Sequence, residues 1–212
     1  MYAISDHSEF ALDIVLTPKP EQQDAATSFL HASKAFVLAE PGTMQWFGYK
    51  VTPDGPWCIF DTFPSEAARA AHTGGDLARA LAANASELLS RAPQIDRLDV
   101  LAHKVLRGRN APTVGVRVLM HAKPDFASIA GLRNALMARY SGVAKEDFTP
   151  YWYAFQKNEM TFGIFGAFYD EAGRRAHVAH AGTQILMSKL EDLTEGGPEV
   201  SFFDIIACKT SP

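Results

Sequence analysis

The chain has 212 residues, of which 47% are hydrophobic and 21% charged, and its formal net charge is −4. This length and apolar content suffice to bury the core of one large domain or two small ones. A negative net charge without any basic block excludes nucleic acid and anionic membrane surfaces as expected partners. No apolar run is long enough to span a bilayer and residues 1–9 lack the pattern of a secretory leader, so we expect a cytoplasmic protein.

The first half of the chain alternates short β-branched or apolar runs with helical spacings of apolar residues. These patterns predict, in chain order, a strand at residues 10–17, a helix at 26–37, strands at 43–51 and 57–63, a helix opened by Pro64, a helix at 77–88 and a strand at 95–103. Glu40-Pro41-Gly42 ends the first helix, because proline and glycine interrupt helical backbone.

The second half repeats this order of patterns. It predicts a strand at residues 114–121, a helix at 126–140, strands at 148–157 and 161–168, a helix with Asp170 as its N-cap, a helix at 186–193 and a strand at 200–209. Each half therefore has the order strand, helix, strand, strand, helix, strand of a ferredoxin-like unit.

The two halves are diverged copies of one sequence. Glu66, Arg69 and His72 recur 105 residues later as Glu171, Arg174 and His177. The same spacing relates Phe63 to Phe168, Asp99 to Asp204 and Lys104 to Lys209. We therefore expect one repeat at residues 9–104 and a second at 113–209, joined by a polar and basic linker at 105–112.

The predicted fold is α+β: two ferredoxin-like βαββαβ repeats that form one intramolecular barrel of the dimeric α+β type. The helices of each repeat cover one face of its sheet and leave an aromatic face that cannot stay in water. A second repeat in the same chain can cover that face. We expect a monomer with this internal pseudo-dimer, or a homodimer of it.

The chain has two cysteines, Cys58 and Cys208, both within predicted strands. Buried thiols that behave as small hydrophobic groups are the expected state. A disulfide is the alternative, which a cytosolic compartment disfavours.

Three features follow one another in the first repeat: Glu40-Pro41-Gly42, the strand Ile59-Phe60-Asp61-Thr62-Phe63, and the following helix with Glu66 and His72. Their order resembles the antibiotic biosynthesis monooxygenase family of the dimeric α+β-barrel superfamily. Members of that family are usually single units that dimerise, so the resemblance implies a fused dimer. It implies a cofactor-independent oxygenase, with neither metal nor cofactor, that acts on a small aromatic, phenolic or quinone-like molecule in the barrel cavity. The alternative is a binding or interaction protein that kept the barrel and lost the chemistry.

The heme-degrading branch of that family does not match this chain. Its asparagine corresponds to Asp13 and Arg117, and its tryptophan corresponds to Phe63 and Phe168. Its histidine corresponds to a position near Ala80 in the first repeat and near Ile185 in the second. Heme degradation is therefore not expected.

Four residues are the candidate catalytic groups: Asp13, Asp61, His72 and Arg117. A histidine with a pKa near neutrality can move a proton of a phenolic substrate, whereas the simpler interpretation is that His72 packs against a strand. Asp13 and Arg117 occupy equivalent places in the two first strands, where an unpaired buried charge would be costly. They would either pair, bind polar substrate groups, or lie at a solvent-facing edge.

Aromatic side chains supply the candidate binding surface. Strand alternation would put Trp46, Trp57 and Phe63 on one inner face, where they could hold a flat aromatic ligand. Trp152, Phe168 and His177 are the candidates in the second repeat. The alternative is that these rings simply fill the barrel core.

Overall fold

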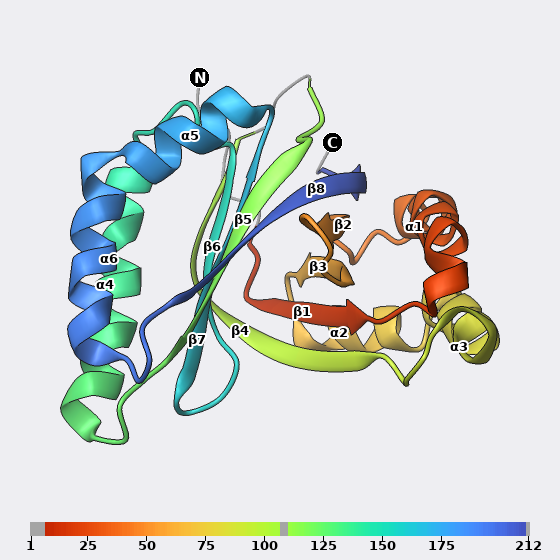
Figure 1. The fold of residues 1–212 in the computed structure, drawn as a ribbon, viewed down its shortest axis with the longest axis horizontal. Helices are drawn as coiled ribbons and strands as arrows, with labels where there is room; N and C mark the ends of the chain where they lie inside the picture. Colours follow the sequence, from red (N-terminus) through yellow and green to blue (C-terminus); the bar gives the residue numbers. More distant parts are fainter. Residues whose placement is uncertain (1–6, 107–109, 211–212) are drawn as a thin grey trace. The chain divides into compact units, whose positions relative to one another are not determined.

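A computed structural model describes residues 7–106 and 110–210, and its ribbon is shown in Figure 1. The first repeat contains β1 (Phe10–Leu16), the 3₁₀ turn η1 (Pro20–Gln22), α1 (Gln23–Leu38), β2 (Gln45–Val51), β3 (Trp57–Phe63), α2 (Glu66–Thr73), α3 (Asp76–Leu88) and β4 (Gln94–Val105). The second repeat contains β5 (Val114–His121), α4 (Phe126–Val143), β6 (Tyr151–Gln156), β7 (Thr161–Phe168), α5 (Glu171–Ala179), α6 (Ala181–Leu193) and β8 (Glu199–Lys209). The predicted order of elements is confirmed in both halves.

N-terminal caps explain where α2 and α5, the equivalent helices of the two repeats, begin. Ser65 precedes α2, and its side chain accepts a hydrogen bond from the main-chain N–H of Ala68. Asp170 precedes α5 and accepts from the N–H of Gly173 in the same way, as predicted for an N-cap. Both helices therefore start at equivalent points of the two repeats.

The strands are hydrogen-bonded in the order β1-β3-β2-β8-β5-β7-β6-β4, and this order closes into a barrel. In the first repeat β3 pairs antiparallel with β1 and with β2. In the second repeat β7 pairs antiparallel with β5 and with β6. The predicted fold class is thus confirmed, and one chain supplies all the strands of the barrel.

The compact units of the structure are not identical to the repeats of the sequence. Of the described residues, one unit contains those between Leu98 and Phe203, and the other combines residues 7–97 with residues 204–210. The boundaries fall inside β4 and β8, so the greater part of the last strand of each repeat belongs to the unit built mainly from the other repeat. The repeat boundaries at 9–104 and 113–209 describe sequence similarity and stay a prediction.

A lysine on the last strand of each repeat contacts the end of a helix that belongs to the other repeat. Lys209, at the end of β8, donates through Nζ to the main-chain oxygens of Val37, in the last turn of α1, and of Glu40, just after α1. Lys104, near the end of β4, donates to the main-chain oxygens of Val143, the last residue of α4, and of Glu146, just after α4. A cation at the carboxyl end of a helix stabilises the exposed carbonyl groups there.

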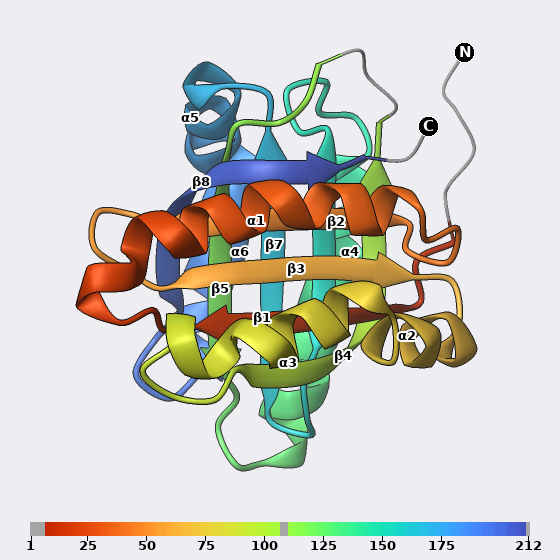
Figure 2. The ribbon, with the colours of Figure 1, turned by 90° about the vertical axis from the view of Figure 1, so that its right-hand side faces the viewer.

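In the unit of the first repeat, β1, β2 and β3 present one face to α1 and α3, which lie in front of these strands in Figure 2. The core between them contains Leu12, Ile14, Trp46, Ile59 and Phe63, together with Leu30 and Leu77 from the helices. Because side chains alternate along a strand, Asp13 and Phe60 point to the opposite face.

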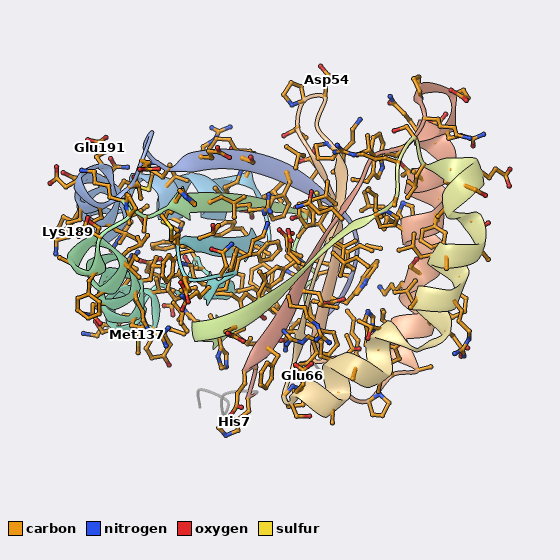
Figure 3. All side chains as sticks on the ribbon, turned by 90° about the horizontal axis from the view of Figure 1, so that it is seen from below. His7, Asp54, Glu66, Met137, Lys189 and Glu191 are labelled. Atoms are coloured by element: carbon orange, nitrogen blue, oxygen red, sulfur yellow. The ribbon has the colours of Figure 1, made fainter. Side chains whose placement is uncertain are left out.

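In the unit of the second repeat, α4 and α6 pack on β5, β6 and β7. Leu132 and Leu136 of α4 and Leu186 and Leu190 of α6 form this core with residues such as Trp152 and Phe162. Met137 and Lys189 lie on the outer side of these helices, as Figure 3 shows.

Cys58 and Cys208 are both buried and free, which confirms the expected thiols. No helix in the described part of the chain is long and apolar enough to cross a membrane. Residues 107–109 of the predicted linker lie outside the described residues.

Candidate functional site

The candidate site of the first unit is centred on His72, which is buried near the end of α2. Nδ1 of His72 lies 2.6 Å from Oε2 of Glu40. On the other side of the ring, Nε2 lies 3.1 Å from Oδ2 of Asp61. The imidazole is therefore held between two carboxyl groups.

The fold brings these two carboxyl groups to His72 from separate elements. Asp61 is on β3, opposite Leu12 of β1 and Trp46 of β2, so all three share the face that packs on the helices. Glu40 follows α1, and the hydroxyl of Thr43 donates to its Oε2 at 2.7 Å. The Thr43 hydroxyl therefore holds the same Glu40 oxygen that contacts the imidazole.

Burial and neighbouring charges set the protonation of this group. Burial alone would lower the pKa of His72, but the charges and hydrogen bonds of Asp61 and Glu40 raise it to about 10. Burial raises the pKa of Asp61 above its ordinary value, although His72 acts against this. Burial also works to raise the pKa of Glu40, but hydrogen bonds with His72 and Thr43 lower it overall. At neutral pH His72 is a buried imidazolium.

A cleft opens beside His72 between the sheet and α3, with a volume of about 290 Å³. We call it the α3 cleft, and it is lined by Leu12, Ile14, Ile59, His72, Thr73, Leu77, Ala78, Leu81, Ala82, Ala85, Pro93 and Ile95. Nearly all of these side chains are apolar. His72 is the one lining group that carries a charge, so the cleft suits a largely apolar molecule with one polar end.

The second unit repeats part of this arrangement. Nδ1 of His177 lies 2.9 Å from Oε2 of Glu146, and the Thr149 hydroxyl donates to that carboxylate at 2.7 Å. Arg139 adds an ion pair to Glu146 that has no counterpart in the first unit, where Ser33 stands at the equivalent position. Burial would raise the pKa of Glu146, but its hydrogen bonds from His177, Arg139 and Thr149 lower it to about 2.

Among the described residues of the second unit, the acid on the other side of the histidine has no counterpart. Gly166 stands at the position of Asp61, and a Cβ atom there would lie 3.1 Å from Cζ of Phe168. The ring of Phe168 therefore lies over Gly166, and it is 5.2 Å from the ring of His177.

The helix that lines the cleft also differs between the units. Ala82 and Ala85 of α3 correspond, 105 residues later, to Met187 and Leu190 of α6. Leu190 is fully buried and Met187 packs against the same core. Larger side chains thus occupy the space that the two alanines leave open.

The structure brings together several of the predicted site residues. Asp61 and His72 are in contact, and the Phe63 ring lies 5.2 Å from that of His72. Trp46 and Trp57 share their core with Phe63, and this face packs against the helices and not toward the barrel interior expected from the sequence. Trp57 lies at the other end of β3, where its Nε1 donates to Thr27. Trp152, Phe168 and His177 occupy the equivalent face of the second unit.

Asp13 and Arg117 lie on the opposite faces of their sheets from these residues. Asp13 is buried on the face with Phe60, and the Tyr49 hydroxyl lies 3.5 Å from its Oδ1. Arg117 is partly buried and pairs in register with Phe165. Their proposed pairing, or their contact with a ligand, stays a prediction.

Sequence reasoning did not single out Glu40 or Thr43 as site residues. The signal was present in the repeat, because Glu146 and Thr149 recur 106 residues later beside His177. Ala82 and Ala85 were missed because an alanine on a helix carries no chemical signature of its own.

No protein-family model and no curated protein matches the sequence. Among solved structures, a candidate monooxygenase from Fusobacterium nucleatum superposes with a TM-score of 0.83 at 14% identity, covering 97% of this chain and 96% of that one. An anthrone oxidase-like protein matches with a TM-score of 0.65 at 12% identity, covering 98% and 94%. A protein of unknown function from Nitrosomonas europaea is 38% identical, covering 49% of this chain and 100% of that one, with a TM-score of 0.46.

The two superpositions that cover nearly the whole chain show that it shares the fold of those structures. The closed order of strands and the two βαββαβ halves agree with it. Over nearly its full length, the chain therefore has the same α+β barrel fold as these solved structures.

Proposed function

We propose that the chain is a cofactor-independent monooxygenase that oxidises a small aromatic, phenolic or quinone-like molecule in the α3 cleft. The observation that carries this proposal is the contact of Asp61 with His72, a residue that lines an apolar cleft of about 290 Å³. Ligand pockets in proteins are roughly 300–1,000 Å³, so the cleft suits a ligand of a few fused rings or fewer.

The site proposed here differs in place from the barrel cavity expected from the sequence. Leu12, Ile14 and Ile59 of the sheet line the cleft on the side covered by α3. Asp13, between Leu12 and Ile14, points to the other face. Asp61 and His72 are therefore the proposed catalytic pair, and Phe63 belongs to their surroundings.

Asp61 is the proposed base, and it takes the proton by way of the His72 ring, because His72 lines the cleft whereas Asp61 is fully buried behind it. Its pKa is raised by burial, which brings it closer to the pKa of a phenol or of a ring-activated methylene group. When the ligand gives its proton to Asp61, the negative charge moves from the carboxylate to the ligand, and His72 stays positive beside it. The imidazolium then stabilises the anion in a cleft from which water is largely excluded.

The electron-rich anion would react with molecular oxygen directly. For a methylene group between two aromatic rings, uptake of one O₂ gives a hydroperoxide, and loss of one water leaves the ketone. The ligand itself supplies the electrons, so the reaction balances without an added reductant.

Oxygen consumption with anthrone-like and quinol compounds tests the proposal. We expect oxygen uptake that saturates with the compound, and we expect its loss in the variant Asp61→Asn. Saturable binding of these compounds without oxygen uptake would instead assign a small-molecule-binding function, which is the alternative. Absence of both binding and oxygen uptake would overturn the proposal.

A further inference from the structure

His72 borders two cavities of the first unit. One is the α3 cleft. The other, of about 440 Å³, lies on the Glu40 side of the ring, and its lining includes Glu40, Thr43, Gly75 and Arg79. We call it the outer pocket. His72 is a lining residue of both cavities.

Glu40 reaches His72 from the outer pocket. Its side chain is 20% exposed, whereas that of Asp61 is fully buried on the other side of the ring. The Glu40 oxygen that contacts Nδ1 also accepts the hydroxyl of Thr43, which itself lies 3.3 Å from Nδ1. Two groups thus fix one edge of the imidazole and leave the other edge facing Asp61.

We propose that Glu40, held by Thr43, is the positioning residue of the site: it fixes the orientation and the positive charge of His72 from the outer pocket. This inference rests on the proposed function, since it assigns a role in presenting His72 to Asp61 and to the ligand. Glu40 itself does not line the α3 cleft.

The second unit provides the matching comparison. Glu146 and Thr149 hold His177 with the same atoms, but Glu146 is also bound by Arg139 and lies 3.3 Å from Nδ1 of His180. No acid replaces Gly166 on the far side of the ring. The Glu–Thr–His arrangement is therefore common to both units, and the acid facing Nε2 is specific to the first.

The charge of His72 depends on the groups packed around its ring. Glu40 and Asp61 are the titratable groups in direct contact, and the ring of Phe63 packs on one side. Lys209 binds the main-chain oxygen of Glu40 and adds a positive charge that helps to lower the pKa of that carboxyl. Loss of the Glu40 charge should therefore lower the pKa of His72.

Titration of the histidine ring nitrogens by ¹H–¹⁵N NMR tests this role without any substrate. In Glu40→Gln we expect the pKa of His72 to fall from about 10 by roughly 1 to 3 pH units, because one of two neighbouring negative charges is removed. We expect the matched variant Glu146→Gln to leave the resonances and pKa of His72 unchanged.

Oxygen uptake gives the second readout. In Glu40→Gln we expect kcat to fall on the order of 10–100-fold, as when a group that orients a functional histidine is removed, with little change in KM. Glu40→Asp should recover part of both kcat and the His72 pKa.

Thr43→Val keeps the Glu40 carboxylate but removes the hydroxyl that donates a hydrogen bond to it. This variant tests the inference if Glu40→Gln does not fold. We expect broadened His72 ring signals and a smaller fall of its pKa. An unchanged His72 titration in the folded Glu40→Gln variant, or in Thr43→Val where it stands alone, would overturn the inference. Absence of oxygen uptake in the wild-type protein would overturn the proposed function and leave the titration to decide the role of Glu40.

Discussion

Nε2 of His72 lies 3.1 Å from Oδ2 of Asp61, and both side chains are buried between the sheet and the helices of the first unit. The second repeat keeps the histidine as His177 but has Gly166 in place of the acid. The two repeats therefore share a fold and differ in the acid that faces Nε2 of His72. This asymmetry leads us to place the activity in the first unit.

Asp61→Asn should abolish oxygen uptake while the protein remains folded. Asparagine has nearly the same shape but cannot accept a proton, so we expect the rate to fall about 10²–10⁴-fold, the usual contribution of a general base. The control is Glu146→Gln, which removes a carboxylate beside the other histidine. A loss of rate as large in Glu146→Gln as in Asp61→Asn would contradict the assignment to the first unit.

Filling the α3 cleft should prevent ligand binding without unfolding the protein. The double variant Ala82→Met, Ala85→Leu introduces the side chains found at Met187 and Leu190. We expect calorimetric binding of an anthrone-like compound to disappear, with the melting temperature unchanged or higher because a cleft is filled. Ala83→Leu, at an exposed position that does not line the cleft, should bind normally. Equal affinity in the double variant would place the ligand elsewhere.

The charge of His72 should make stability fall in alkaline solution. Its pKa rises from 6.5 to about 10 in the folded state, so folding favours the protonated ring. This contribution is complete below pH 6.5 and is lost as the pH rises through about 10. Urea unfolding of the wild type and of His72→Gln checks it: the stability difference should be constant at low pH and shrink across this range. A difference independent of pH would show that His72 is neutral in the folded protein.

Lys209 should contribute to stability through the end of α1. Its Nζ binds the main-chain oxygens of Val37 and Glu40, which methionine cannot do. We expect Lys209→Met to lower the free energy of unfolding by about 1–3 kcal/mol, because buried carbonyl groups lose their partner. Lys104→Met should do the same at α4. Lys189→Met, on the exposed side of α6, should change the free energy by less than about 0.5 kcal/mol.

Asp13 tests the role of the opposite sheet face. If Asp13 is the buried partner of Arg117, Asp13→Ala should destabilise the protein by about 3–5 kcal/mol, the scale of an uncompensated buried charge. If Asp13 serves a ligand, the change should spare the melting temperature and abolish binding. A variant with both properties unchanged would remove Asp13 and Arg117 from the site.

The sequence alone determined the duplication, the βαββαβ order of both halves and the barrel class. These features depend on local periodicity, on N-caps such as Asp170 and on one spacing that recurs along the chain. All three can be recognised in the amino-acid sequence without knowledge of tertiary contacts. His72 and Asp61 could also be singled out, because charged or titratable groups next to buried strands are unusual.

Only the tertiary structure decided which groups meet. Glu40 contacts His72 across 32 positions of the chain, and no local pattern specifies that contact. The sheet face covered by α3 was equally undetermined, because strand alternation separates two faces but does not say which one a helix covers. The α3 cleft exists because Ala82 and Ala85 leave space, and the absence of a side chain acquires meaning only when the surrounding residues have been packed.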